Sequence, residues 1–390
     1  MLVSAAGLLA AGLISACGTL TTDFVFVTSA KAAGTNNYGE INIFEINSES
    51  GAMRQIPASP VPSGGRNPVA EAVSTDATTL FVLNEDDNTL AQFVIGSDGK
   101  LYPYATINTP GIEPIALTTS SSMLFVVDTF QPLPSCTAVS PCSGSVSVLP
   151  LIPATSSASM GLGSPVTNPA NASTYWPLTL PSAPTDVMVP TAVTLSGSNL
   201  FVSAYDASTS SKIGYIFAFT VGSTGALTAV ANSPFAAGSQ PVSVSADGTG
   251  KYLYAADFTA NKVLGYSISA TGALTALSGS PYAAGNGPSA VVADPSYGFV
   301  YVANSTDSNV TAYSASSGVL TRVATYASGV DPVAIGIDPS THHFVYTANF
   351  LGSNISDWQL SSTDGTLVVA QGSPNGTNAN PTAVAAVPHK

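Results

Sequence analysis

The apolar positions of this 390-residue chain fall in short runs separated by turns. Three or four consecutive apolar residues recur near residues 24–27, 80–83, 124–127, 200–202, 253–255, 300–302 and 345–347. Continuous runs of this kind indicate strands that are covered on both faces. Several are followed by a stretch that alternates apolar and polar residues, as in 262–266 and 309–313, which is typical of half-buried strands. The pattern therefore predicts an all-β fold.

A proline followed by small or aliphatic residues marks the start of each repeat, and we call these prolines the anchors. They are Pro68, Pro114, Pro190, Pro241, Pro288, Pro332 and Pro381. The intervals between them are 44 to 51 residues, with one of 76 residues. A blade of a β-propeller, built from four strands, has about this period. Glycine-containing turns, as at Asp98-Gly99, supply the positive φ that tight hairpins require.

The two ends of the chain complement each other. Residues 23–60 supply three strands without an anchor strand, whereas residues 381–387 form an anchor strand with nothing after it. We therefore predict a seven-bladed β-propeller over residues 23–390, with four antiparallel strands per blade. The C-terminal strand joins the N-terminal blade and closes the ring, which leaves no free sheet edge at the joint. The long interval predicts loop insertions on the third blade, at about residues 129–185.

The N-terminus carries a targeting pattern. Residues 2–16 are uncharged and rich in Leu and Ala, and are too short to span a membrane comfortably. The segment Ile14-Ser15-Ala16-Cys17 resembles the bacterial lipobox, in which the cysteine is lipidated. We expect a signal peptide at 1–16, a tether at 17–22, and an exported protein anchored in the bacterial cell envelope, facing the periplasm or in the outer membrane. A buried apolar helix is the alternative interpretation.

The other two cysteines, Cys136 and Cys142, lie close together in a stretch rich in Pro and Ser. In an exported protein this spacing favours a disulfide that holds a loop. A metal site would need further soft ligands nearby, and the surrounding sequence has none. His342 and His343 fall on an expected turn without a third ligand, and we interpret them as surface residues.

Charge narrows the range of partners. Only 8% of the residues are charged, and nine Lys and Arg against 22 Asp and Glu give a formal net charge of −13. An acidic chain without a basic stripe excludes nucleic acid as a main partner. The scarcity of cations also argues against substrates that carry several phosphates, because these need Arg or Lys clamps.

The predicted topology gathers acids and amides at one end of the ring, where anchor strands begin and second strands end. Arg66 and Glu85 break the repeat on the second blade, and a carboxylate beside a guanidinium would suit a base with an oxyanion stabiliser. A partly exposed ion pair is the alternative. Asn and Asp at strand ends also hold turns, which is the alternative for the other members. The candidate substrate-binding residues are Asn67, Asn84, Glu113, Asp128, Asp257, Asn304, Asp331 and Asn349.

Several short motifs resemble one family across nearly all of the chain after residue 23. They are Tyr-Val-Ala-Asn at 301–304, Tyr-Thr-Ala-Asn at 346–349, Thr-Gly-Ala-Leu at 224–227 and 271–274, and Asn84-Glu85. The chain thereby resembles the seven-bladed propeller lactonases, relatives of 6-phosphogluconolactonase, and surface-layer propellers with Tyr-Val-Thr-Asn repeats. Phosphogluconolactonase-like members carry Gly-Pro-Arg-His at an anchor, where this chain has Gly287-Pro288-Ser289-Ala290. The resemblance therefore implies hydrolysis of a neutral lactone.

Two functions follow as hypotheses. The first is an envelope lactone hydrolase acting on a small neutral lactone or sugar lactone, with Glu85 and Arg66 as catalytic residues. The second is a non-catalytic propeller that binds a glycan, a protein or a cation at the acid-rich end. Neither requires a cofactor; a divalent cation would need six or more oxygen ligands at one point. We expect a monomer that meets the membrane only through its lipid anchor.

Overall fold

The computed structural model describes residues 21–31, 37–137, 139–155, 158–339 and 341–389. The predicted lipidation site Cys17 and the predicted signal peptide lie outside these residues. The described residues form no helix that is long and apolar enough to cross a lipid bilayer.

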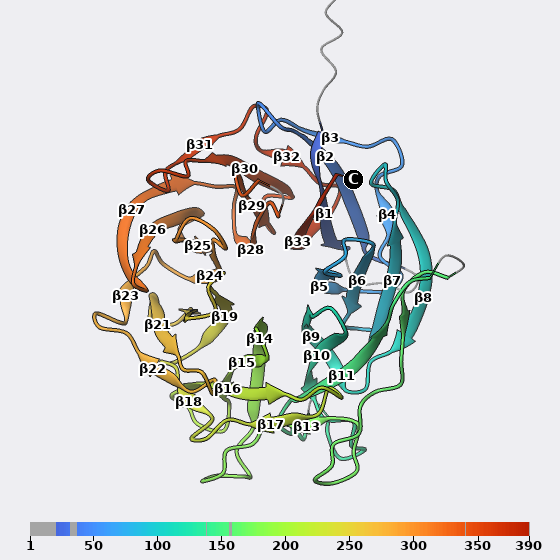
Figure 1. Ribbon diagram of the computed structural model, residues 1–390, viewed down its shortest axis with the longest axis vertical. Helices are drawn as coiled ribbons and strands as arrows, with labels where there is room; N and C mark the ends of the chain where they lie inside the picture. The colour runs from blue at the N-terminus through green and yellow to red at the C-terminus, as the bar shows by residue number, and fades with distance from the viewer. Residues whose placement is uncertain (1–20, 32–36, 138, 156–157, 340, 390) are drawn as a thin grey trace, which may run out of the picture.

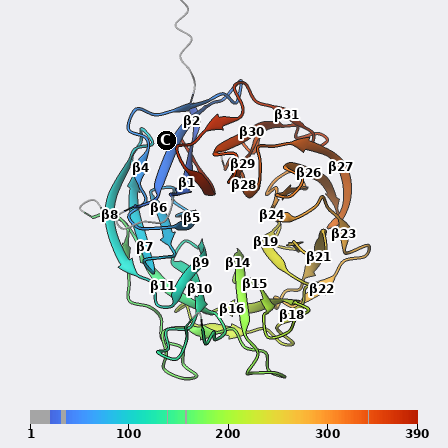
Figure 2. The same cartoon turned by 180° about the vertical axis from the view of Figure 1, so that it is seen from behind.

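Seven antiparallel sheets surround a common axis (Figures 1 and 2), which confirms the predicted seven-bladed β-propeller. From the axis outward, the first blade contains β33 (Asn380–Pro388), β1 (Thr21–Ala30), β2 (Glu40–Asn47), β3 (Met53–Gln55) and β4 (Val61–Pro62). The second contains β5 (Pro68–Val73), β6 (Thr79–Asn84), β7 (Thr89–Ile95) and β8 (Leu101–Asn108). The third contains β9 (Ile112–Thr119), β10 (Met123–Phe130), β11 (Ser145–Ile152), β12 (Gly161–Leu162) and β13 (Trp176–Pro177).

The remaining four blades follow the same order from the axis outward. The fourth contains β14 (Met188–Ser196), β15 (Asn199–Asp206), β16 (Ile213–Val221), β17 (Leu227–Ala229) and β18 (Phe235–Ala236). The fifth contains β19 (Pro241–Ala246), β20 (Tyr252–Asp257), β21 (Lys262–Ile268), β22 (Leu274–Ala276) and β23 (Tyr282–Ala283). The sixth contains β24 (Pro288–Ala293), β25 (Phe299–Asn304), β26 (Asn309–Ser316) and β27 (Val319–Ala327). The seventh contains β28 (Pro332–Ile337), β29 (Phe344–Asn349), β30 (Asn354–Leu360), β31 (Leu367–Val369) and β32 (Asn375–Gly376).

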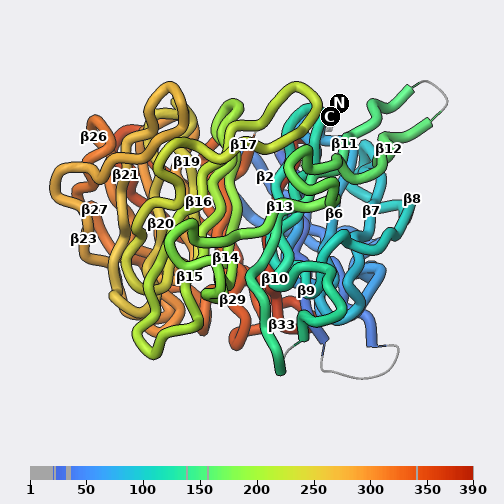
Figure 3. Tube along the Cα trace, turned by 90° about the horizontal axis from the view of Figure 1, so that it is seen from below, coloured from blue at the N-terminus to red at the C-terminus, as the bar shows by residue number. Residues whose placement is uncertain are grey.

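The ring closes as predicted, by the last strand pairing with the first. β33 runs antiparallel to β1, with Phe24 opposite Val387 and Val27 opposite Val384. Both ends of the described chain therefore lie on one face of the ring (Figure 3). We call this face, with the hairpins between first and second strands, the hairpin face. The opposite face, where inner strands begin and second strands end, is the rim face.

The fourth strand differs from the expected single strand in five blades, where two short segments pair with the third strand. In four of these blades a Ser-Pro pair separates the segments. Proline has no N–H to donate to the ladder, so it interrupts the strand. The serine hydroxyl takes the place of a strand carbonyl: Ser59 Oγ accepts the N–H of Ile43 at 2.7 Å. The same bond recurs at Ser233, Ser280 and Ser373.

The second strand of each blade forms the core, as its apolar run predicts. Every residue of β6, β25 and β29 is buried. In β6, Phe81 and Leu83 pack with Leu117 and Leu124 of the next blade. Because both faces of the second strand meet a neighbouring blade, an apolar run rather than an alternating pattern is stable there.

Candidate functional site

The anchors position a ring of polar residues on the rim face. Pro68 lies opposite Asn84 in the β5–β6 pair, and the pairing shifts by one residue just after the proline. The N–H of Glu85, directly after β6, donates to the carbonyl of Asn67 at 2.9 Å. The residue before an anchor and the residue after the second strand are thus held together. We call the ring made by these two positions in successive blades the axial rim.

The residues before four anchors have left-handed backbone conformations. These φ values are 50° at Asn67, 55° at Glu113, 62° at Gly287 and 60° at Asp331. The left-handed region is uncommon for residues with a side chain, and such residues concentrate at functional sites. Three of these four residues, Asn67, Glu113 and Asp331, are candidate substrate-binding residues, and they lie on the axial rim.

The left-handed residues are held by the blade before them. Asn88 Oδ1 accepts the N–H of Glu113 at 2.6 Å, and Asn261 Oδ1 accepts the N–H of Gly287 at 2.8 Å. Asn88 lies in the β6–β7 loop, which also contains Glu85. The bond from Asn88 therefore fixes the backbone of Glu113 against the loop that carries Glu85. Sequence analysis missed Asn88, although a polar residue four positions after the Asn or Asp of the second strand recurs along the chain, as at Asn261, Ser308 and Ser353.

Arg66 and Glu85 lie on the same blade but have different partners. The guanidinium of Arg66 pairs with Asp87: Nε lies 2.7 Å and Nη2 2.5 Å from Oδ1. The backbone N–H of Arg66 donates to the other oxygen of Asp87 at 2.7 Å. Glu85 Oε2 accepts a hydrogen bond from Asn67 Nδ2 at 2.7 Å, and the same amide reaches Asp86 Oδ1 at 3.2 Å. Asp87 is thus a site residue that sequence analysis missed.

The carboxyl groups of this blade differ in acidity. Burial raises the pKa of Glu85, and the nearby carboxylates of Glu113 and Asp86 raise it further. Burial also acts to raise the pKa of Asp87, but the hydrogen bonds and charge of Arg66 outweigh it and hold that pKa below its usual value. A carboxylate with a raised pKa is better suited to accept a proton near neutral pH than its neighbours are.

The other candidate substrate-binding residues lie inside the blades. They lie at or near the ends of second strands, are at most 1% exposed, and comprise Asn84, Asp128, Asp257, Asn304 and Asn349.

Hydrogen bonds within their own blades occupy several of these side chains. The carboxylate of Asp257 accepts the N–H groups of Ser239 and Gln240 at 2.7 and 3.0 Å. Asn349 Nδ2 donates to Asn354 Oδ1 at 2.7 Å. Burial raises the pKa of Asp128 to about 8. Buried groups bonded in this way hold the strand ends and loops. The axial rim, rather than the strand ends, therefore presents the polar groups that a ligand could reach.

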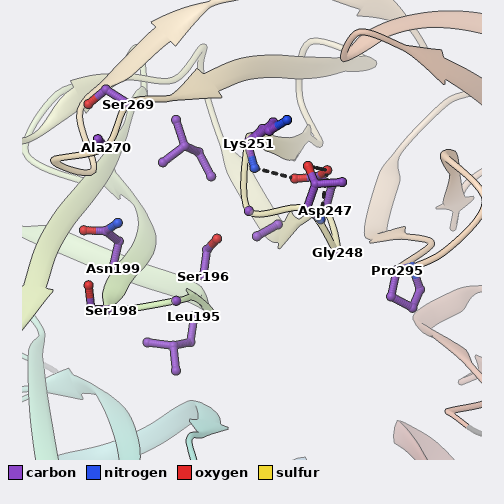
Figure 4. Close-up of a pocket in the computed structure, with 15 residues that line it drawn as sticks. Leu195, Ser196, Ser198, Asn199, Asp247, Gly248, Lys251, Ser269, Ala270 and Pro295 are labelled. Carbon is purple, nitrogen blue, oxygen red and sulfur yellow. Dashed lines mark hydrogen bonds between the residues drawn. The ribbon is translucent and has the colours of Figure 1, made fainter.

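Several hollows lie outside the axial rim, and among them are two that contain charged side chains. One, of about 820 Å³, lies on the hairpin face between the fourth and fifth blades (Figure 4). Its Asp247 carboxylate already accepts the N–H groups of Lys251 and Tyr252, at 2.9 and 2.8 Å. The other, of about 310 Å³, is lined by Lys31, Tyr38 and Glu40 on the rim face. In the part of the chain that the structure describes, no three His, Cys, Asp or Glu side chains are grouped to hold a metal ion.

A disulfide joins Cys136 and Cys142 in the β10–β11 loop, with the two Cα atoms 5.3 Å apart. His342 and His343 lie in the β28–β29 hairpin on the opposite face from the axial rim. His342 Nδ1 lies 2.7 Å from Ser296 Oγ of the preceding blade, and the ring of His343 stacks on Tyr297. These contacts join the sixth and seventh blades.

Comparison with known proteins assigns the family. The model of the family described as "Lactonase, 7-bladed beta-propeller" matches residues 173–289 and 270–389, together more than half of the chain. The chain belongs to this lactonase family. Among proteins with curated functions, none matches the chain.

Solved structures with the same fold include proteins that carry lactonase names. This lactonase-family propeller is similar to a periplasmic gluconolactonase of Pseudomonas aeruginosa, with 17% identity, a TM-score of 0.71, and 94% and 99% of the two chains covered. It is also similar to a candidate 6-phosphogluconolactonase of Bacteroides fragilis, with 17% identity, a TM-score of 0.71, and 95% and 99% covered. At this identity the likeness establishes the propeller fold.

Proposed function

We propose that this protein hydrolyses a neutral lactone at the axial rim of its second blade. The observation that carries the proposal is the Glu85 carboxylate, held by Asn67 beside the Arg66–Asp87 pair. Membership of the lactonase family supports the reaction class. The family alone does not assign the residues, because many functions share one fold.

The reaction can be written with these groups. Glu85 takes a proton from water as the water oxygen attacks the lactone carbonyl carbon. The negative charge that develops on the carbonyl oxygen is stabilised by the guanidinium of Arg66, which Asp87 holds in place. The ring C–O bond then breaks, and the leaving oxygen receives the proton from Glu85. The product is a hydroxy acid, and the carboxylate of Glu85 is restored.

The charged groups of the axial rim favour a neutral substrate. The axial rim carries the carboxyl groups of Glu85, Glu113 and Asp331. Its cation Arg66 pairs with Asp87 and faces the lactone carbonyl oxygen in this mechanism, so it is not free to bind a phosphate. Ser289 stands where phosphogluconolactonase-like propellers have Arg, and its hydroxyl donates to the carbonyl of Pro332 at 2.5 Å. That position therefore joins two blades instead of offering a phosphate clamp. A phosphorylated sugar lactone would meet repulsion here without a compensating cation.

Replacing the base tests the proposal. Glu85→Gln is expected to lower kcat/KM for γ-butyrolactone and glucono-δ-lactone by about 100-fold, because an amide cannot accept the proton from water. The matched control is Glu49→Gln, which changes an exposed carboxylate on the hairpin face and should keep the wild-type rate. Acid release followed with a pH indicator measures both. Equal rates for the two variants would remove Glu85 from the mechanism, and no hydrolysis by the wild-type protein would favour the non-catalytic binding hypothesis.

We also propose that Cys17 is lipidated after export. Only three residues separate it from β1, so the lipid-bearing Cα lies at most about 14 Å from the start of that strand. Because β1 starts on the hairpin face, the axial rim would point away from the membrane.

Cell fractionation tests this anchor. Cys17→Ser should move the protein from the membrane to the soluble fraction. Two or three acyl chains anchor a protein stably, and the variant would carry no acyl chain at this residue. The variant in which both Cys136 and Cys142 are changed to Ser should stay in the membrane fraction. Retention of Cys17→Ser in the membrane fraction would contradict lipidation at this residue.

A further inference from the structure

The axial rim is not polar all the way round. The position that Glu85 takes after β6 is occupied by Phe258 after β20 and by Phe350 after β29. Their N–H groups donate to the carbonyls of Gln240 and Asp331 at 3.0 and 2.8 Å, as the N–H of Glu85 does to Asn67. Aromatic residues in the fifth and seventh blades therefore leave the backbone at places equivalent to the proposed base.

Apolar side chains at or next to these places are exposed, although Phe350 itself is partly buried. Phe258 is 38% exposed, and its ring lies over Gly287, where an added Cβ would come 3.2 Å from ring atom Cε2. In the seventh blade, Val330 is 53% and Leu351 64% exposed. The N–H of Gly352 donates to the carbonyl of Val330 at 3.0 Å, which keeps these two residues adjacent. We call Phe258, Val330, Phe350 and Leu351 the apolar wall.

The blade of Phe258 lies across the axis from the blade of the proposed base, and the blade of the other apolar-wall residues lies between them along the ring. Figure 1 shows β5 and β6 on one side and β19 on the other, with β28 and β29 between them along the ring. Glu85 and Glu113 belong to the second and third blades, whereas the apolar wall belongs to the fifth and seventh. A ligand that extends from the second blade toward the fifth and seventh would leave the carboxyl groups of Glu85 and Glu113 and meet apolar side chains, with Asp331 as the rim carboxyl group beside them.

We propose that the substrate is a neutral lactone that carries an alkyl or aryl substituent. This inference rests on the proposed function: the lactone ring lies at Glu85 and Arg66, and the substituent packs on Phe258 and Leu351. Each methylene group removed from water strengthens binding by about fourfold. The side chains of the apolar wall thus select for substituent length and take no part in the bond-breaking steps.

A series of γ-lactones with four to ten carbons tests the substrate class. For the wild-type protein, kcat/KM should rise at least tenfold from the shortest to the longest, mainly through a lower KM. Phe258→Ala and Leu351→Ala should each cut the long-to-short ratio of kcat/KM by about tenfold. Val369→Ala changes an equally exposed apolar residue on the outer strand β31 and should keep the wild-type ratio.

The outcomes separate this inference from the proposed function. Hydrolysis of all chain lengths at one kcat/KM would overturn the apolar wall as a substrate contact and leave the proposed function standing. The same chain-length dependence in Phe258→Ala would do so too. If no lactone is hydrolysed, the proposed function fails. Calorimetry with a 5-hexyl-2-pyrrolidinone lactam, which resists hydrolysis, then decides whether the wall binds hydrocarbon. If the lactam does not bind, or binds Phe258→Ala as tightly as the wild-type protein, the inference is overturned. A surface for a protein partner would then be the better interpretation.

Discussion

A chain that ends at Ala379 is expected not to fold. The deletion removes β33, whose pairing with β1 closes the described ring. It also removes Val387 from the core, and it leaves the buried strand β1 as a free edge at the axis. The hydroxyl of Thr382, which bridges the carbonyls of Thr28 and Pro68 at 3.1 and 2.8 Å, is lost as well. The first blade would then lack its inner strand and the contacts of that strand with the second blade.

The measurement is thermal unfolding followed by circular dichroism, together with limited proteolysis. The shortened protein should show no cooperative transition and should be cleaved rapidly. The control ends at Pro388 and lacks only the last two residues, of which His389 is exposed and touches the ring of Phe24. It should unfold within a few degrees of the full chain. A cooperative transition in the protein that ends at Ala379 would mean that the N-terminal strands close the ring by themselves.

The fold could be predicted because each blade repeats the same physical requirement. A second strand between two neighbouring blades needs an apolar run, such as the one that contains Phe81 and Leu83, and the anchors mark where each inner strand begins. Seven copies of a weak pattern make a strong one. The split fourth strand was not predicted, because it depends on one hydroxyl, such as that of Ser59, replacing a strand carbonyl.

The pairing of side chains could not be predicted in the same way. Three acids follow Asn84, and only the path of the loop decides which one faces the guanidinium of Arg66. Asn88, in a left-handed conformation with φ 52°, helps to define that path. The loop turns Asp87 toward Arg66 and leaves Glu85 with Asn67. Repeats define positions, whereas contacts between unique residues depend on torsion angles that a sequence pattern does not show.

Glu71 is a buried carboxyl group on the inner strand β5, at a position where the other blades have aliphatic residues. It should make the stability of the protein depend on pH. Thr28 of the ring-closing blade donates a hydrogen bond from Oγ1 to Glu71 Oε2, and Glu71 Oε1 is buried. Burial raises the pKa of Glu71 to about 8, although hydrogen bonds from Thr28 and the backbone of Ala385 act to lower it. The third residue after the anchor is aliphatic in the other six blades: Leu117, Val193, Val244, Val291, Ile335 and Val384.

Stability should therefore fall as the pH rises. The pKa of Glu71 is about 8 in the folded protein against an ordinary value of 4.5, so between these values the folded state binds more protons than the unfolded state. Stability is unaffected by this group below pH 4.5 and decreases up to about pH 8, where the carboxylate is charged in both states. Asp128 and Asp357, with pKa values raised by burial to about 8 and about 7, act in the same direction.

Replacing the carboxyl with the residue of the next blade isolates its contribution. Glu71→Leu matches Leu117 and should raise the free energy of unfolding by roughly 3–5 kcal/mol at pH 9, with a much smaller change at pH 4.5. Urea unfolding at the two pH values measures this difference. Glu71→Gln, which is neutral but keeps a hydrogen-bond acceptor for Thr28, is the matched control and should also lose most of the pH dependence that Glu71 causes. If both variants lose as much stability as the wild-type protein between pH 4.5 and 9, the carboxyl is charged at neutral pH, and the joint between the first two blades tolerates that charge.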